Sequence, residues 1–132
     1  MAEPLSNEQL VQYRKRLRAR HGELLGEVRR ELLQSDSERY IQLAGAVHDT
    51  GDESVADLLA DLSNDEIDRH VQEIRRVEAA LQRIAVGAYG VCADCGQAIA
   101  GERLEVYPTA TRCYTCQTKY EQTYDQTGGS TL

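Results

Sequence analysis

Hydrophobic residues recur every three or four positions over two long stretches of the chain. This spacing places them on one face of an α-helix, so the sequence predicts two amphipathic helices. The first begins at Ser6, which forms a possible capping box with Gln9. Its hydrophobic face consists of Leu10, Tyr13, Leu17, Leu24, Val28, Leu32 and Leu33. The second runs from Val55 to about Val86, with Leu58, Leu62, Ile67, Val71, Ile74, Leu81 and Ile84.

Neither hydrophobic face is stable in water, and pairing the two helices as an antiparallel coiled coil buries both. The strongest turn signal between them is the run Asp49-Thr50-Gly51-Asp52. A second possible capping box, from Ser35 to Glu38, indicates that the first arm breaks near Gln34 and restarts. The antiparallel register pairs Leu17 with Leu81, Leu24 with Ile74, and Val28 with Val71.

Composition agrees with this helical interpretation. The chain has 132 residues, about one domain, with two Pro and neither Phe nor Trp. We therefore predict an all-α dominated fold: a long coiled-coil hairpin over 1–91, a small four-cysteine module with a short terminal helix over 87–125, and a flexible tail over 126–132. No hydrophobic run approaches the about 18–20 residues that span a bilayer, and the N-terminus lacks a signal-peptide pattern. We expect a cytoplasmic protein with no membrane partner.

Acidic residues are concentrated in the centre of the chain. The formal net charge is −7. Residues 35–68 alone contribute −9, from ten acidic groups and one basic group, whereas the stretches on either side are mildly basic. In the predicted hairpin the acidic tip lies near 47–56. A solubilising end would explain it, and so would an end that contacts a positively charged partner. The overall acidity argues against a surface that binds nucleic acid throughout.

All four cysteines lie in one segment, as Cys92-Ala93-Asp94-Cys95 and Cys113-Tyr114-Thr115-Cys116. The spacing C-x2-C-x17-C-x2-C matches zinc sites, in which two such pairs complete one tetrahedron. Four thiolates leave no open position on the metal, so we predict a single structural Zn²⁺. Two disulfides are the alternative, and a reducing cytoplasm disfavours them.

No set of residues with a catalytic pattern is visible in the sequence. It lacks a phosphate-binding glycine loop, a G-x-S-x-G motif and a paired-histidine metal motif. His70 lies on the hydrophobic side of its helix, where a packing role is more common than a ligand role. We therefore expect a protein that is not an enzyme.

Several residues around the cysteines form a wider motif, in which the Gly-x-Tyr-Gly run and the Arg-Leu and Pro positions are not demanded by zinc itself. They are Gly87, Tyr89 and Gly90 before the first pair, Gly96 and Ile99 after it, and Arg103, Leu104 and Pro108 before the second. Together with the cysteines they resemble the zinc-finger signature of the DksA/TraR family, and with the hairpin the similarity covers about residues 10–125. The resemblance implies a bacterial transcription regulator that binds RNA polymerase, inserts its coiled coil into the secondary channel and, in many members, acts with ppGpp in the stringent response.

The resemblance also assigns roles to the acidic tip. Asp49 and Asp52 stand where family members have two aspartates, and Ser54 stands where alanine is usual. A carboxylate brought near basic side chains or Mg²⁺ can bind them or bias mobile elements nearby.

Two arginines of the second helix match basic positions in the members that respond to ppGpp. Arg69 and Arg76 are seven residues apart, so both can face one phosphate group or one acidic rim. Ordinary solvation or ion pairing on the helix is the alternative for both. Gln117 stands where those members have a lysine, which leaves the ppGpp dependence open.

Two functional hypotheses follow. The first is a polymerase-binding transcription regulator, expected to be a monomer. The second is a zinc-stabilised coiled-coil adaptor that binds a different protein. Sequence-specific DNA binding by the zinc module is disfavoured, because residues 92–132 carry a charge of −2.

Overall fold

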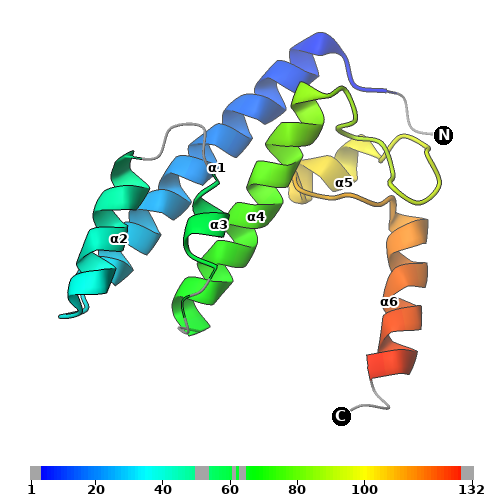
Figure 1. Ribbon diagram of the computed structural model, residues 1–132. Helices are drawn as coiled ribbons and strands as arrows, with labels where there is room; N and C mark the ends of the chain where they lie inside the picture. Colours follow the sequence, from blue (N-terminus) through cyan, green and yellow to red (C-terminus); the bar gives the residue numbers. More distant parts are fainter. Residues whose placement is uncertain (1–3, 50–53, 61, 63–64, 129–132) are drawn as a thin grey trace. The chain divides into compact units, whose positions relative to one another are not determined.

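The structure is a computed structural model that describes residues 4–49, 54–60, 62 and 65–128 (Figure 1). The helices of the described residues are α1 (Asn7–Leu33), α2 (Glu38–Asp49), α3 (Val55–Leu58), α4 (Asp65–Ala85), α5 (Gly101–Val106) and α6 (Tyr114–Gly128). An isolated antiparallel bridge joins Val91 to Ala98. None of the helices among the described residues is both long enough and apolar enough to cross a bilayer.

The predicted antiparallel helical hairpin is confirmed as the pairing of α1 with α4. Arg20 of α1 contacts Glu73 of α4, and the later residues Glu27 and Glu31 of α1 contact the earlier residue His70 of α4. Most of the hydrophobic positions marked in α1 and α4 are buried, and those with at most 3% exposure are Leu17, Leu24, Val28, Leu32, Ile67, Val71 and Ile74. Leu33, which the pattern also places on the hydrophobic face, is 50% exposed, whereas Val77, which the pattern did not mark, is 1% exposed.

The first arm of the hairpin breaks where the sequence predicts. At the start of α1, the Ser6 N–H donates to Gln9 Oε1 at 2.9 Å and the Gln9 N–H donates to Ser6 Oγ at 3.2 Å, which is the predicted capping box. α1 ends at Leu33, and α2 begins at Glu38. Between them the Ser37 N–H donates to Ser35 Oγ at 3.1 Å, which stabilises the connection.

The second arm differs from the expectation of one helix from Val55 to Val86. It consists of α3, which ends at Leu58, and α4, which begins at Asp65 (Figure 1). The first turn of α4 contains three acidic residues, Asp65, Glu66 and Asp68. Carboxylates there interact favourably with the positive end of the helix dipole and favour a new helix start. The predicted turn at 49–52 lies mostly outside the described residues.

The chain forms two compact units. One contains residues 14–82, and the other combines residues 1–13 with residues 83–132. In the second unit the Tyr13 ring lies 5.6 Å from the Tyr89 ring, centroid to centroid, and the Tyr13 hydroxyl donates to Glu105 Oε1 at 3.1 Å. The N-terminal residues therefore pack with the cysteine segment. α6 extends to Gly128, so residues 126–128 of the expected tail are helical, and residues 129–132 lie outside the described residues.

Candidate functional site

The sulfur atoms of Cys92, Cys95, Cys113 and Cys116 all lie within 4.8 Å of one another. Cys95 Sγ and Cys113 Sγ are 3.9 Å apart. Zinc–sulfur bonds of about 2.3 Å in a tetrahedron require sulfur–sulfur distances of about 3.8 Å. The cluster therefore fits one zinc ion, held by all four side chains, and the cysteines form a structural C4 centre.

Short backbone hydrogen bonds shape the loop that carries the first cysteine pair. The Cys92 N–H donates to the Gln97 carbonyl at 2.8 Å, and the Gly96 N–H donates to the Cys92 carbonyl at 3.0 Å. Gly96 has a φ of +75°, in the left-handed region that favours glycine. The second pair lies at the start of α6, where the Cys116 N–H donates to Cys113 Sγ at 3.4 Å.

The environment of the four thiols favours a bound cation. Burial raises the pKa of Cys92, but backbone N–H groups of Cys113, Cys95 and Asp94 outweigh it and lower the pKa to about 6. A hydrogen bond with Cys113 and desolvation raise the pKa of Cys116 to about 12. The pKa values of these two thiols thus lie on opposite sides of the ordinary cysteine value. A bound zinc ion would stabilise the thiolate form of every cysteine that coordinates it.

The motif residues that zinc itself does not demand hold the centre in place. The Tyr89 hydroxyl donates to the Pro108 carbonyl at 2.6 Å, which joins the start of the module to the segment before the second pair. The Arg103 Nε donates to the carbonyl of Arg112, the residue before Cys113, at 2.9 Å. Ile99 and Leu104 are buried, with at most 1% exposure. These contacts explain why the signature extends beyond the cysteines.

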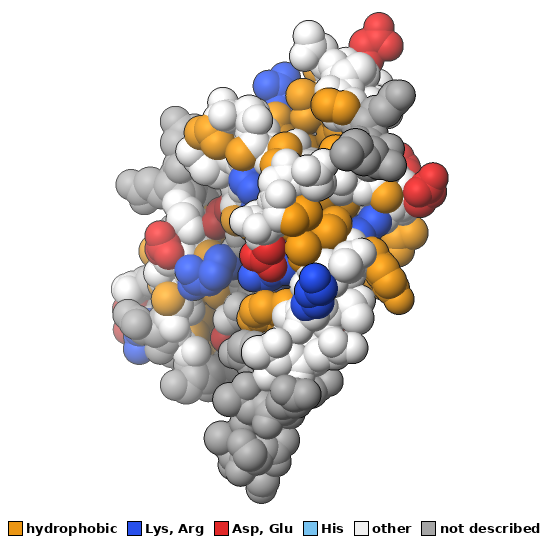
Figure 2. Space-filling view, turned by 90° about the vertical axis from the view of Figure 1, so that its right-hand side faces the viewer, with side chains coloured by type: hydrophobic (Ala, Val, Ile, Leu, Met, Phe, Trp, Pro, Cys, Tyr) orange, Lys and Arg blue, Asp and Glu red, His pale blue; other side chains and the backbone are white. Residues whose placement is uncertain are grey.

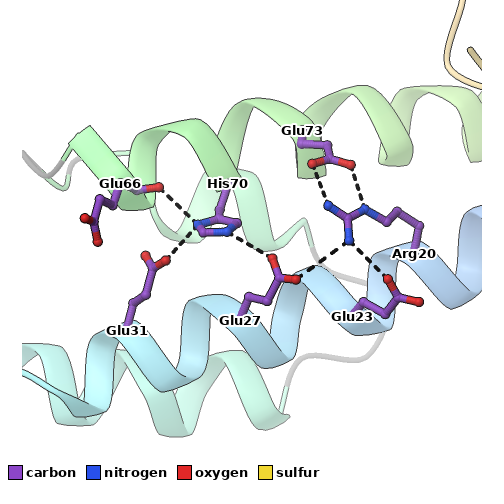
Figure 3. Close-up of polar contacts among 7 residues, drawn as sticks. All are labelled: Arg20, Glu23, Glu27, Glu31, Glu66, His70 and Glu73. Carbon is purple, nitrogen blue, oxygen red and sulfur yellow. Dashed lines mark hydrogen bonds and ion pairs between the residues drawn. The ribbon is translucent and has the colours of Figure 1, made fainter.

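A polar network links α1 and α4 beside their hydrophobic interface (Figure 3). Arg20 makes a two-pronged contact with Glu73, at 2.7 Å from Nε and 2.8 Å from Nη2. His70 Nε2 lies 3.0 Å from Glu27, and His70 Nδ1 lies 3.1 Å from Glu31. The Arg20 hydrogen bond lowers the pKa of Glu73, although burial opposes it. His70 thus joins α1 to α4 through polar contacts beside the hydrophobic interface, where the sequence predicts a packing role.

The structure places the predicted residues of the acidic tip in different surroundings. Asp49 is the last residue of α2, and Asp52 lies outside the described residues. Ser54 caps α3, since its Oγ accepts a hydrogen bond from the Asp57 N–H at 3.2 Å. The same Oγ donates to Glu78 Oε1 of α4 at 2.8 Å. Ser54 is therefore attached to α4.

The two predicted arginines, Arg69 and Arg76, are exposed on α4. Neither forms an ion pair with another described residue. Arg69 lines a shallow depression whose other walls carry both charges: Arg20 and His70, and also Glu31, Glu66 and Glu73. The depression is therefore not an anion site by itself. Gln117 donates to Glu121 Oε1 at 3.1 Å on α6.

Sequence reasoning did not identify Glu78 and His21. Glu78 joins Ser54 of the α3 cap to α4, and His21 Nε2 of α1 lies 3.0 Å from Glu78 Oε2. Both residues have polar or charged side chains and lie next to the hydrophobic face of their own helix. Their sequence positions alone carry no sign that they meet, because the contacts span 24 and 57 residues.

Comparison with known proteins agrees with this architecture. Residues 87–122 match the family model described as "Prokaryotic dksA/traR C4-type zinc finger". The RNA polymerase-binding transcription factor DksA of Caulobacter vibrioides is 31% identical over 123 residues, which cover 91% of this chain and 82% of that protein. The protein of the same name from Haemophilus influenzae is 28% identical over 127 residues, which cover 96% and 84%.

The fold also has a counterpart among solved structures. The solution structure of the DnaK suppressor protein from Agrobacterium tumefaciens aligns with a TM-score of 0.55 at 29% identity, over 90% of this chain and 99% of that one. The similarity to the relatives extends over the helical hairpin as well as the zinc module. With its C4 centre, its helix pair and this similarity along most of its length, the chain belongs to the dksA/traR C4-type zinc-finger family.

Proposed function

We propose that this protein is a non-enzymatic transcription regulator that binds RNA polymerase. The main support is the extent of the similarity to the Caulobacter DksA, which bears the name of an RNA polymerase-binding transcription factor and of which the aligned residues cover 82%. A zinc module shared on its own would say little about a partner. Similarity along the helix pair as well favours a shared mode of action.

Within this proposal, the segment 47–56 enters the secondary channel of the polymerase. Asp49 and Asp52 are the acting carboxylates, and they belong to the most acidic part of the chain. A carboxylate delivered near basic side chains or Mg²⁺ can bind them directly or bias mobile elements nearby. The C4 centre stabilises the zinc module itself.

Two further features support a protein partner. Arg69 and Arg76 are exposed on α4 and are the candidate contacts for ppGpp or for an acidic rim of the polymerase. The unit with the cysteines also carries hydrophobic side chains that water reaches, and Figure 2 shows such side chains among charged ones on the face it presents. Those at least 58% exposed in this unit are Val86, Val106, Tyr107 and Tyr114. A contiguous patch of such groups would be typical of a protein-binding surface, whereas single ones are common on any protein.

The proposal is tested with Asp52→Asn in transcription from a promoter that the wild-type protein regulates. We expect the variant to lose the regulatory effect while it keeps its zinc, its helicity and its binding to core polymerase. Asp36→Asn is the matched control, because it removes one charge from the same acidic stretch outside 47–56 and should leave regulation unchanged. Regulation at the wild-type level by Asp52→Asn would exclude the assignment of the tip.

Binding itself is tested by co-purification with core polymerase, with and without ppGpp, in competition with a known secondary-channel factor. We expect a complex that the competitor displaces. If no complex forms at micromolar concentration, the zinc-stabilised adaptor for another protein becomes the better hypothesis. Duplex DNA alone should give no specific complex.

A further inference from the structure

The carboxylate of Glu78 is the meeting point of three parts of the chain. Ser54 Oγ donates to its Oε1 at 2.8 Å, and the Val55 N–H donates to its Oε2 at 3.2 Å. His21 Nε2 of α1 lies 3.0 Å from the same Oε2. One side chain of α4 therefore holds the cap of α3 and a residue of α1.

These contacts are shielded from solvent. The side chains of Glu78 and His21 are 22% and 24% exposed, and Val55 is 1% exposed. A carboxylate with so little access to water needs hydrogen-bond donors, and hydrogen bonds to a charged group are about twice as strong as those between neutral groups. The Ser54 hydroxyl is both donor and acceptor, because it donates to Glu78 and accepts a hydrogen bond from the Asp57 N–H.

The position of this contact along α4 matters for the acidic segment. Glu78 lies thirteen residues after Asp65, the first residue of α4, which corresponds to about 20 Å along the helix axis. Ser54 and Val55 are thus held beside the interior of α4. Ser54 follows Asp52 by two residues in the sequence, so the contact involves the residues directly after the two aspartates.

Another polar contact at this place is weaker. Arg75 Nη1 lies 3.6 Å from Asp57 Oδ1, and these side chains are 49% and 76% exposed. Exposed ion pairs contribute little to stability. Val55, Ala56 and Leu59 are buried and add hydrophobic contacts, which have no preferred direction. Glu78 therefore supplies the directional contact that fixes the position of this segment.

We propose that Glu78 is a positioning residue that fixes Ser54 and Val55 against α4, and that the regulatory action assigned to Asp49 and Asp52 depends on this attachment. The anchoring itself is inferred from the contacts of Glu78 with Ser54, Val55 and His21. Its consequence for transcription rests on the proposed function.

The anchoring is tested by amide hydrogen exchange in the full, zinc-loaded chain. In Glu78→Gln the neutral amide keeps the size of the side chain but loses the charge that the three partners share. We expect the Val55 amide to exchange at least about tenfold faster, since a hydrogen bond to a charged group is lost. The Ile74 amide inside α4 serves as the internal reference and should not change.

Two further variants separate anchoring from a general loss of structure. Ser54→Ala removes the cap, so exchange should accelerate at Asp57, while the bond from Val55 to Glu78 remains. Asp68→Asn removes an exposed charge from the same helix and should leave both amides unchanged. An unaltered Val55 exchange rate in Glu78→Gln would overturn the proposal, whatever the polymerase assay shows.

The regulatory consequence has its own readout. Where wild-type protein regulates transcription, Glu78→Gln should weaken the effect at saturating protein while its affinity for polymerase stays within about twofold, which is small on the scale of a single lost contact. If the Val55 amide exchanges faster but regulation is unchanged, regulation does not depend on the attachment of Ser54 and Val55 to Glu78. If the wild-type protein does not act on polymerase, the proposed function fails, and the anchoring is judged by exchange alone.

Discussion

Arg20 and Glu73 illustrate how single residues specify the pairing of the two long helices. The guanidinium contacts both carboxylate oxygens of Glu73, and its Nη1 lies 3.1 Å from Glu23 and 3.7 Å from Glu27. The hydrophobic interface favours the pairing of α1 with α4 but would allow one helix to slide along the other. A two-pronged contact forms in only one alignment of the two helices. The pair of Arg20 and Glu73 therefore fixes the register of α1 and α4 and also stabilises their pairing.

We expect Glu73→Gln to lower the free energy of unfolding of the helix pair by about 0.5–1 kcal/mol at pH 7, because both partners are more than one third exposed to water. The pKa of Glu73 is lowered in the folded protein. Its stabilising contribution is therefore complete above the ordinary value of 4.5 and is lost as the pH falls through the lowered one.

Urea denaturation followed through amide signals of α4 measures this difference at pH 7 and pH 3. Glu102→Gln, a change of the same charge on exposed α5, is the control and should have little effect at either pH. A loss from Glu73→Gln that is equal at both pH values would contradict a charge-dependent contact.

At the scale of elements, two glycines have opposite roles. Gly22 lies inside α1, and a Cβ added there would meet no atom within 4 Å. Gly90 precedes the first cysteine pair with a φ of +79°, and a Cβ there would lie 3.0 Å from Leu5 Cδ1. The first glycine only weakens its helix, whereas the second is required by the backbone of the zinc loop.

The same substitution should therefore have opposite effects at these positions. Gly22→Ala should stabilise α1 by about 0.5–1 kcal/mol, since alanine loses less backbone freedom in a helix. Gly90→Ala should destabilise the module by about 1–2 kcal/mol, because a residue with a Cβ resists the left-handed conformation. Thermal unfolding of the zinc-loaded variants, followed by amide signals in each unit, measures both. Destabilisation by both variants would contradict this assignment.

At the scale of the whole molecule, the chain divides into two compact units of which one contains the C4 centre. Residues 83–128 have few large buried side chains, among them Tyr89, Ile99 and Leu104. A core this small rarely folds without a metal or another crosslink. The unit over 14–82 has its own hydrophobic interface between α1 and α4.

Removal of zinc should therefore unfold one unit only. A strong chelator is expected to abolish the helices α5 and α6 and to leave the amide signals of α1 and α4 within residues 14–82 dispersed, because metal binding is coupled to folding in such modules. Cys95→Ser should reproduce this result without chelator. Complete unfolding after zinc removal, or no change in the α5 signals, would contradict the expected independence.

The spacing of cysteines and hydrophobic residues in the sequence predicts much of the structure of this protein. The C-x2-C pairs specify a C4 centre because both thiolates of a pair reach one ion from neighbouring positions. The hydrophobic repeat predicts the two long helices that pair, and the capping box of Ser6 with Gln9 predicts the start of the first one, because both signals act within one or two helical turns.

Contacts between distant residues were decided only by the tertiary structure. Glu78 meets Ser54 across 24 residues and His21 across 57, and Tyr13 meets Glu105 across 92. Glu78 is one of 22 acidic residues in the chain, and no local sequence pattern singles it out. The packing of residues 1–13 with the cysteine segment belongs here too, because local preferences do not specify partners that are far apart in the sequence.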